Sequence, residues 1–214
     1  MLHIERFVCN PFQENCYIVS DETQKAVIID CGAFYKEERA AVVAYIRDNK
    51  LNPKRLIATH AHIDHNFGNN TIYDEFGLKP QVYYKDELLM NKLSEQAVEF
   101  CNYHIDYAMP PIGEYLKKDD VIDWGSHRFT IIPTPGHTPG SVFFYCKEEK
   151  LAFSGDTLFR MSIGRTDFEL GSYDDIIKSL HYIATTLPAD TVILPGHGPQ
   201  TTMKEELQMN PYLK

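Results

Sequence analysis

The sequence contains a dense group of side chains of the kinds that bind divalent metal ions. Three histidines and one aspartate lie within six residues, in the segment His60-Ala-His-Ile-Asp-His65. Imidazole nitrogen and carboxylate oxygen are good ligands for borderline ions such as zinc, iron and manganese. Burying these groups beside a strand without an ion would leave polar atoms unsatisfied for no gain. The segment therefore predicts a metal site, to which it contributes four candidate ligands: His60, His62, Asp64 and His65.

Three further candidate ligands stand in short glycine-containing motifs. They are His137 in Thr-Pro-Gly-His-Thr-Pro, Asp156 in Ser-Gly-Asp-Thr and His197 in Pro-Gly-His-Gly. Each follows a predicted strand, and the missing Cβ of the adjacent glycine permits a tight turn and a close approach to an ion. His60 and His62 project to the same face of an extended segment, so both imidazoles can reach one ion. Because loops at strand ends can converge on one cleft, we expect all seven side chains to form a single site.

The elements that must position these side chains can be read from the hydrophobic pattern. Runs of β-branched, aromatic and apolar residues predict strands in both halves of the chain. Helices are predicted where apolar residues recur at helical spacing. Strand groups in both halves, each with helices that carry one apolar face, favour the α+β class, as two packed sheets covered outside by helices in a four-layer αββα sandwich. The predicted strands are 17–19, 26–30, 55–59, 81–84, 127–132, 141–145, 151–154 and 191–194, and the predicted helices are 37–49, 66–76, 86–103 and 173–186.

Composition limits the domain organisation and the partners. The 214 residues contain no internal repeat and no Gly/Ser/Pro-rich linker, so we interpret 1–214 as one domain. The chain carries 21 Lys plus Arg against 30 Asp plus Glu, a net charge of -9, and no long basic run. This balance argues against nucleic acid or an anionic membrane as the main partner. A small-molecule substrate remains the expected partner, and the sequence carries no signal for an oligomeric state.

The cysteines and the N-terminus bear on location. The five cysteines are odd in number, scattered and without a Cys-x-x-Cys pair, which is typical of reduced thiols in a cytosolic protein. The first residues show no basic segment followed by an apolar stretch, and no apolar run approaches the roughly 18 residues of a membrane helix. We therefore expect a soluble cytoplasmic protein.

Motifs along nearly the whole chain carry a family resemblance. With these motifs in the order found in the family, the sequence resembles the metallo-β-lactamase-fold hydrolase superfamily. It is most similar to the short single-domain members of the glyoxalase II-type (hydroxyacylglutathione hydrolase-like) branch. The segments that carry the resemblance are 10–17, 27–32, 59–65, 134–140, 153–159, 163–167 and 194–198.

The resemblance implies two adjacent divalent metal ions, with zinc expected and iron or manganese as alternatives. His60, His62 and His137 would hold one ion, while the other would be held by Asp64, His65 and His197. Asp156 would bridge both. The resemblance also gives catalytic roles to Asp64, His65 and Asp156.

The implied reaction is attack of a metal-bridging hydroxide on the carbonyl of a small thioester such as S-lactoylglutathione. Metal coordination lowers the pKa of water from 15.7 to about 7, which makes this nucleophile available near neutral pH. A thiolate leaving group, whose conjugate acid has a pKa of about 8.5, departs without a protein general acid. An amide nitrogen leaves less easily, and no further acid is obvious near the motifs. Thioester or activated ester cleavage is therefore favoured over amide cleavage.

Three features lie outside the ligand set. The larger glyoxalase II enzymes bind glutathione largely through a C-terminal helical domain, so we expect segment 86–115 to serve here as a helical lid over the active site. His197 is followed by Gly-Pro instead of the Glu-Tyr of longer glyoxalases, which bears on glutathione recognition. Asp30 is interpreted as a turn residue or as an acceptor for a metal-bound imidazole. Arg165 and Asp167 would either organise the loops of the site or meet an anionic substrate.

Three alternatives differ in chemistry from the thioesterase. A persulfide dioxygenase-like enzyme would use one iron held by His60, His137 and Asp156, and it shares the Gly-Arg-Thr-Asp-Phe motif. A lactonase or a β-lactamase is compatible with the motifs but is disfavoured by the loop 163–168. A non-enzymatic metal-binding scaffold is the least favoured, because a purely structural module has no use for a bridging carboxylate.

Overall fold

The first half of the chain forms one six-stranded sheet in a computed structural model that describes residues 2–214. The strands lie in chain order, with β1 to β3 antiparallel and β3 to β6 parallel. Helix α1 (Lys36–Asp48) joins β3 to β4, and α2 (Asn69–Phe76) lies between β4 and β5. The strands are β1 (His3–Cys9), β2 (Glu14–Ser20), β3 (Lys25–Ile29), β4 (Asn52–Ile57), β5 (Pro80–Tyr83) and β6 (Glu114–Leu116).

The second half forms a second six-stranded sheet in the order β14-β13-β10-β9-β8-β7. Only the β10–β13 pair is parallel, because α5 (Tyr173–Thr186) lies between these two strands in the chain. A separate two-stranded hairpin, β11 (Leu158–Phe159) with β12 (Ser162–Ile163), follows β10. The strands of the sheet are β7 (Val121–Trp124), β8 (His127–Pro133), β9 (Val142–Cys146), β10 (Leu151–Gly155), β13 (Val192–Pro195) and β14 (Thr201–Thr202).

Strand β3 shows how the layers are built. Alternate residues of a strand point to opposite faces of the sheet. Val27 and Ile29 enter the core between the two sheets, which also contains the rings of Phe129, Phe144 and Phe153. Ala26 and Ile28 enter a second core beneath α1, together with Val42 and Ile46. Both faces of the strand are therefore buried, which explains its uninterrupted apolar sequence.

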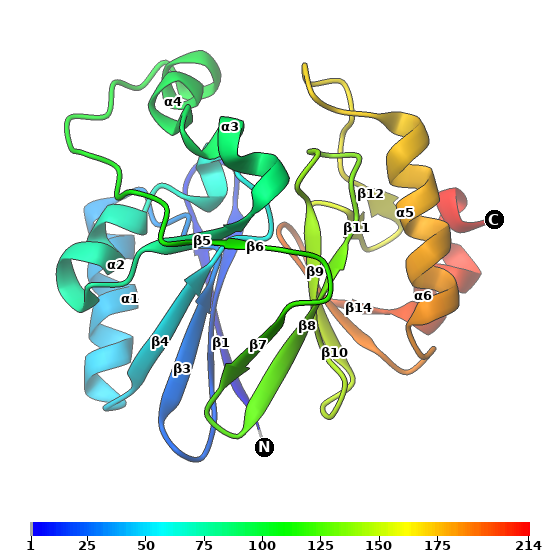
Figure 1. Cartoon of the computed structure of the whole chain (residues 1–214), viewed down its shortest axis with the longest axis horizontal. Helices are drawn as coiled ribbons and strands as arrows, with labels where there is room; N and C mark the ends of the chain where they lie inside the picture. Colours follow the sequence, from blue (N-terminus) through cyan, green and yellow to red (C-terminus); the bar gives the residue numbers. More distant parts are fainter. Residues whose placement is uncertain (1) are drawn as a thin grey trace.

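Helices cover the outer faces of both sheets (Figure 1). Helices α1 and α2 lie outside the first sheet, and α5 and α6 (Met203–Met209) lie outside the second. Ser172 caps the N-terminus of helix α5, since its hydroxyl accepts a hydrogen bond from the Asp175 N–H, and the helix buries Ile176, Leu180 and Ile183. The α+β class and the αββα order expected from the sequence are thus confirmed.

The segment predicted as a lid differs from a continuous helix. It contains two short helices, α3 (Glu87–Met90) and α4 (Leu93–Cys101), after the 3-10 helix η2 (Tyr84–Asp86). Residues 102–113, all described, form neither helix nor strand, and Glu114 already belongs to β6. The helical part of 86–115 is therefore shorter than predicted.

Several element boundaries also differ from the prediction. The strand predicted at 55–59 ends at Ile57, and the helix predicted at 66–76 begins at Asn69, after the 3-10 helix η1 (Ile63–His65). The pattern did not predict α6 or the strands β1, β6, β7, β11, β12 and β14. Among residues 2–214, no helix has the length and apolar character needed to cross a membrane.

Candidate metal centre

The seven candidate ligands lie on loops at one end of the two sheets. His60 and His62 follow β4 in a short loop, and Asp64 and His65 lie on η1 directly after it. His137 lies between β8 and β9, while Asp156 follows β10 and His197 follows β13. The structure brings all seven together, as the sequence predicts, although His60 and His62 lie beyond the end of the strand.

Three imidazoles form the first ligand cluster. The ligand atoms of His60, His62 and His137 all lie within 4.8 Å of one another, and all three residues are buried. Nδ1 of His62 is 2.9 Å from Nε2 of His137. Three nitrogen atoms converging on one point match the coordination that a divalent ion such as zinc accepts from protein.

A second cluster combines two imidazoles with a carboxylate. The ligand atoms of Asp64, His65 and His197 also lie within 4.8 Å of one another. Nε2 of His197 is 3.2 Å from Oδ2 of Asp64, and Nε2 of His65 is 3.7 Å from the same oxygen. This donor set of nitrogen and oxygen suits zinc, iron or manganese.

Asp156 lies between the two clusters. Its Oδ1 is 3.3 Å from Nε2 of His65, and its Oδ2 is 3.6 Å from Nε2 of His137 and 3.5 Å from Nε2 of His197. One carboxylate therefore faces both clusters, which is the geometry of a bridging ligand.

The second nitrogen of four imidazoles is fixed by a neighbour. His65 Nδ1 donates to Oδ2 of Asp30 at 3.0 Å, His137 Nδ1 donates to the carbonyl of Arg165 at 2.7 Å, and His197 Nδ1 donates to the carbonyl of Phe12 at 3.0 Å. The Thr59 hydroxyl gives its proton to Asp30, so it accepts from Nδ1 of His60 at 3.1 Å. Such partners set the tautomer that leaves the other nitrogen free for a metal.

Asp30 therefore serves as the acceptor that the sequence left as one of two interpretations. Its carboxylate orients His65 directly and orients His60 through Thr59. It also accepts a hydrogen bond from the backbone N–H of Thr59 at 2.7 Å. One buried carboxylate thus supports an imidazole of each cluster.

The two clusters differ in their proton affinity. Burial, and then the neighbouring His137, lowers the pKa of His62 to about 3, and burial also lowers the pKa of His60 well below its usual value. Although burial acts against it, the carboxylates of Asp156 and Asp64 raise the pKa of His65 well above its usual value. Burial also acts to lower the pKa of His197, but the facing carboxylate of Asp156 outweighs it and the pKa is raised. His60 and His62 in the first cluster therefore favour the neutral imidazole, whereas His65 and His197 in the second favour the protonated form between the carboxylates.

The buried polar atoms of the site fit a bound cation. Nε2 of His60, Nε2 of His65 and Oδ1 of Asp156 are buried and have no hydrogen-bond partner among residues 2–214. Unpaired buried polar atoms cost free energy, and most buried groups in proteins are satisfied. All three atoms point to the clusters, where a divalent ion would satisfy them. The donor set and the orphaned atoms together fit metal ions.

Glycine at position 196 makes room for this arrangement. A Cβ built at Gly196 would lie 2.3 Å from Oδ1 of Asp156 and 2.6 Å from Cε1 of His65. Real Cβ atoms do not approach other atoms so closely. Gly196 therefore permits the close approach of the β13 loop to the centre.

Two polar residues that the sequence did not single out hold the His60–His65 loop. Both oxygens of the buried Asp86 carboxylate accept hydrogen bonds, from the Ala61 N–H, the Thr138 hydroxyl and the Gly140 N–H. The side chain of Gln96 on α4 accepts from the Ile63 N–H and donates to the Ala61 carbonyl. The local sequence does not indicate this function for Asp86 or Gln96, because Asp is common at the start of a helix and Gln is common within one.

The backbone and the side chain of Arg165 make different contacts beside the candidate metal centre. Its backbone carbonyl orients His137, and its guanidinium forms two hydrogen bonds to Asp167, at 2.6 and 2.7 Å. The guanidinium also lies over the ring of Phe168, 4.2 Å from its centroid. The backbone of this motif thus organises the site, while its side chain is held at the edge of the cleft.

A cleft opens above the centre. It has a volume of about 670 Å³. Candidate ligands line its floor, and apolar rings and Arg165 line its walls, the rings being Phe12, Phe100, Phe159 and Phe168. A concave, largely apolar cavity with a few convergent polar groups is typical of a small-molecule site.

Comparison with known proteins assigns the family. The model of the metallo-β-lactamase superfamily matches residues 9–197. The chain therefore belongs to the metallo-β-lactamase superfamily, as its motifs predict, and is a metallo-hydrolase by fold and family.

Three relatives cover almost all of the chain. The hydroxyacylglutathione hydrolase GloC of Haemophilus influenzae is 35% identical over 99% of this chain and 98% of its own length. The crystal structure of the BLEG-1 B3 metallo-β-lactamase is 30% identical, with a TM-score of 0.90 over 99% of this chain and 100% of that chain. The structure of TTHA1623 in a di-iron-bound form is 31% identical, with a TM-score of 0.86 over 98% of this chain and 100% of that chain.

Proposed function

We propose that this protein is a metal-dependent thioesterase that cleaves a small thioester such as S-lactoylglutathione. The observation that carries the proposal is the pair of ligand clusters joined by Asp156 at the floor of a cleft. Similarity to a hydroxyacylglutathione hydrolase over almost the full length of both chains supports the choice of substrate class.

The proposed roles follow the two clusters. His60, His62 and His137 would hold one ion and Asp64, His65 and His197 the other, with Asp156 shared. Divalent ions bound there supply Lewis-acid chemistry, because they lower the pKa of water to about 7 and polarise a carbonyl oxygen. Zinc is the proposed metal, with iron or manganese as alternatives.

Protein side chains orient the candidate ligands and balance their charge. Asp64 and Asp156 place negative charge beside His65, and Asp30 keeps the His65 ring in one tautomer. These three residues, Asp64, His65 and Asp156, are the ones to which we assign catalytic roles. A thiolate, whose conjugate acid has a pKa of about 8.5, leaves without a protonated side chain. The site therefore needs no general acid for a thioester.

Segment 86–115 is proposed to cover the bound substrate within a single domain. Helix α4 of this segment contributes Glu99 and Phe100 to the wall of the cleft, and the ring of Phe100 lies 6.3 Å from that of His62, measured between centroids. Free thiols at all five cysteines support a reducing, cytoplasmic location.

A second candidate function is hydrolysis of β-lactams. It is favoured by the 30% identity and the TM-score of 0.90 to a structure described as a B3 metallo-β-lactamase. The two functions differ in the leaving group, since a β-lactam releases an amine nitrogen and a thioester releases a thiolate.

Thiol release from S-D-lactoylglutathione tests the proposal. The protein is assayed as purified, with metal content determined on the same sample, and again after removal of metal by a chelator. We expect release that is lost on chelation and restored by zinc. A chromogenic cephalosporin is tested in parallel under the same conditions.

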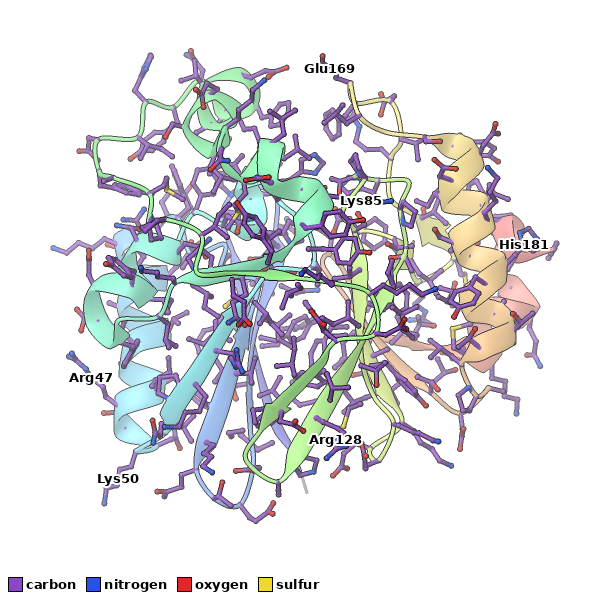
Figure 2. The ribbon with its side chains drawn as sticks, in the orientation of Figure 1. Arg47, Lys50, Lys85, Arg128, Glu169 and His181 are labelled. Carbon is purple, nitrogen blue, oxygen red and sulfur yellow. The ribbon has the colours of Figure 1, made fainter. Side chains whose placement is uncertain are left out.

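Matched variants connect the activity to the clusters. Asp64→Ala and His137→Ala should each abolish turnover in a folded protein, whereas His181→Ala should not change it, because His181 is exposed on the outer side of α5 (Figure 2). Full activity of either cluster variant would exclude the dinuclear mechanism. One bound iron without thiol release would favour persulfide oxidation, and cleavage of the cephalosporin alone would favour the second candidate.

A further inference from the structure

A second cavity continues the cleft away from the candidate metal centre. It has a volume of about 250 Å³ and lies between helices α3 and α4 on one side and loop 168–171 on the other. The two walls face each other at the top of Figure 1, and Figure 2 labels Glu169 at the tip of the loop. His62 and His137 line both cavities, so the second one reaches the first ligand cluster directly. We name this second cavity the side arm.

Apolar side chains contribute to both walls of the side arm. Leucines and phenylalanines from α3, α4 and the loop line it, and two of the leucines are exposed residues, Leu88 at 53% and Leu170 at 38%. Exposed apolar groups on both walls of a groove beside a reactive centre mark a binding site for apolar surface. The wall residues are Leu88, Leu89, Phe100, Phe168 and Leu170.

The buried polar side chains of the side arm are already satisfied by protein. The amide of Gln96 bonds to the Ile63 N–H and to the carbonyls of Ala61 and Leu89. The hydroxyl of Thr138 donates to Asp86. The charged side chains that line the side arm, among them Lys92 and Glu95, are exposed at its rim. The side chains of Gln96 and Thr138 are therefore engaged within the protein, and the candidate ligands His62 and His137 are the other buried polar side chains of the lining.

The size of the side arm selects the kind of apolar group. An apolar cavity of about 150 Å³ is large enough to bind benzene. At about 250 Å³, the side arm has room for a phenyl ring with linking carbons or for an unbranched chain of similar volume.

We propose that the side arm binds the acyl group of the substrate, and that the preferred acyl group is apolar and larger than lactoyl, such as hexanoyl or phenylacetyl. This inference rests on the proposed thioesterase function and adds the substrate class. Phe168 is a specificity-determining residue in this arrangement, since its ring lies 5.1 Å from that of His62 and 5.1 Å from that of Phe100, measured between centroids.

A series of thioesters with one thiol tests the acyl preference. The thiol is N-acetylcysteamine, which is small and uncharged, and the acyl groups are acetyl, lactoyl, butanoyl, hexanoyl and phenylacetyl. Each fully buried methylene contributes a factor of about four, so we expect kcat/KM to rise at least about tenfold from acetyl to hexanoyl. Hexanoyl should also exceed lactoyl.

Filling the side arm should remove the preference. Leu170→Trp places a large ring in the side arm from an exposed loop position, and Leu88→Trp does so from the opposite wall. In each variant the hexanoyl-to-acetyl ratio of kcat/KM should fall about tenfold. Leu207→Trp is the matched control, because Leu207 is an exposed leucine on α6, far from the cleft, and its ratio should equal that of the parent.

Binding without turnover separates this inference from the proposed function. Ketone analogues, with a methylene in place of sulfur, are titrated calorimetrically, and the hexanoyl analogue should bind about tenfold more tightly than the acetyl analogue. Tighter binding of the hexanoyl analogue without hydrolysis of any thioester would overturn the thioesterase function and support the acyl-binding role of the side arm. Thioester hydrolysis with equal kcat/KM for all acyl groups would overturn the acyl-binding role of the side arm and leave the thioesterase function in place.

Discussion

The carboxylate of Asp86 and the hydroxyl of Thr138 form a 2.7 Å hydrogen bond that joins the two halves of the chain beside the candidate metal centre. Asp86 precedes α3, and Thr138 follows the candidate ligand His137 in the second half. The same carboxylate accepts from the Ala61 N–H at 2.9 Å, between the candidate ligands His60 and His62. One side chain thus connects the loops of the first ligand cluster with the start of α3.

Replacing Asp86 should therefore damage both stability and metal binding. Asp86→Ala leaves the buried Ala61 and Gly140 N–H groups without an acceptor, at a cost of about 3 kcal/mol in the free energy of unfolding. Displacement of His60, His62 and His137 should lower the affinity for metal at least about tenfold. Urea unfolding and competition with a chromophoric chelator measure the two effects.

An exposed aspartate provides the control for Asp86. Asp123, with 70% of its side chain exposed, pairs only loosely with Arg128 at 3.4 Å, and Asp123→Ala should change stability by less than about 0.5 kcal/mol. Unchanged metal affinity in Asp86→Ala would show that the first cluster does not depend on this hydrogen bond.

The sequence predicted the candidate site more completely than the fold around it. Metal-ligand chemistry needs particular residue types, and His60, His137 and Asp156 were singled out because they lie in a dense histidine cluster or in glycine-containing motifs after predicted strands. Asp86 and Gln96 do not, because their function depends on which distant backbone groups they meet, and only the tertiary structure determines that.

The same distinction explains which elements were missed. Strand β3 is buried on both faces and is uniformly apolar, so its pattern predicts it. The edge strand β1 alternates polar and apolar residues with partial burial, and β6 has only three residues. Such strands are defined by pairing with a neighbour more than by their own composition. No proline or glycine lies between α3 and α4, so the sequence does not mark the break between these helices.

Gly196 yields a prediction about the bridging carboxylate. In Gly196→Ala the new methyl group would overlap Oδ1 of Asp156 and Cε1 of His65, so both side chains must shift. A displacement of about 1 Å at a reacting centre costs on the order of 100-fold in rate. We expect thioester turnover to fall by this factor and bound metal, measured by atomic emission, to fall by about half.

Gly77→Ala is the matched control for this variant. Gly77 ends α2 with φ of 70°, and no atom of the described residues lies within 4 Å of its added Cβ. Backbone strain should cost about 1 kcal/mol in stability without loss of metal. Equal metal content in the two variants would argue against a steric role for Gly196.

Metal binding should release more protons from His65 and His197 than from His60 and His62. The raised pKa of His65 and that of His197 favour protonated rings between the carboxylates, and a metal ligand must give its proton up. The lowered pKa values of His60 and His62 mean that these imidazoles have none to release.

Calorimetric titration in buffers of different ionisation enthalpy measures this release. The binding heat of the ion in the second cluster should depend more strongly on the buffer than that of the ion in the first. His197→Ala removes one titrating group and should lower the proton count of the buffer-dependent step, whereas His181→Ala should leave it unchanged. Buffer-independent heats for both ions would contradict the protonated second cluster.

Acid stability should depend on Asp21, at the end of the sandwich opposite the site. Asp21 follows β2 and accepts from the Ser126 N–H of the second sheet at 2.7 Å and from the Thr23 N–H at 2.9 Å. In Figure 2, Arg128 marks the end of the molecule where this turn lies, opposite Glu169. Burial acts against the shift, but hydrogen bonds from Thr23 and Ser126 lower the pKa of Asp21 to about 2.

The sign of the pH effect follows from that lowered pKa. The unfolded chain has the ordinary value of 3.8, so the contribution of Asp21 is fully present above pH 3.8 and is lost as the pH falls through about 2. Asp21→Ala should therefore cost about 2 kcal/mol at pH 7, because it removes the charged acceptor of the Ser126 and Thr23 N–H groups, and less at pH 3. Urea unfolding at both pH values measures the difference in the free energy of unfolding. Chelator-treated protein is used, so that loss of metal at low pH does not contribute. The control Asp190→Ala removes an exposed carboxylate paired with Lys150 and should change the free energy of unfolding only slightly at either pH. An equal loss of stability in Asp21→Ala at pH 7 and pH 3 would contradict the link between the lowered pKa of Asp21 and stability.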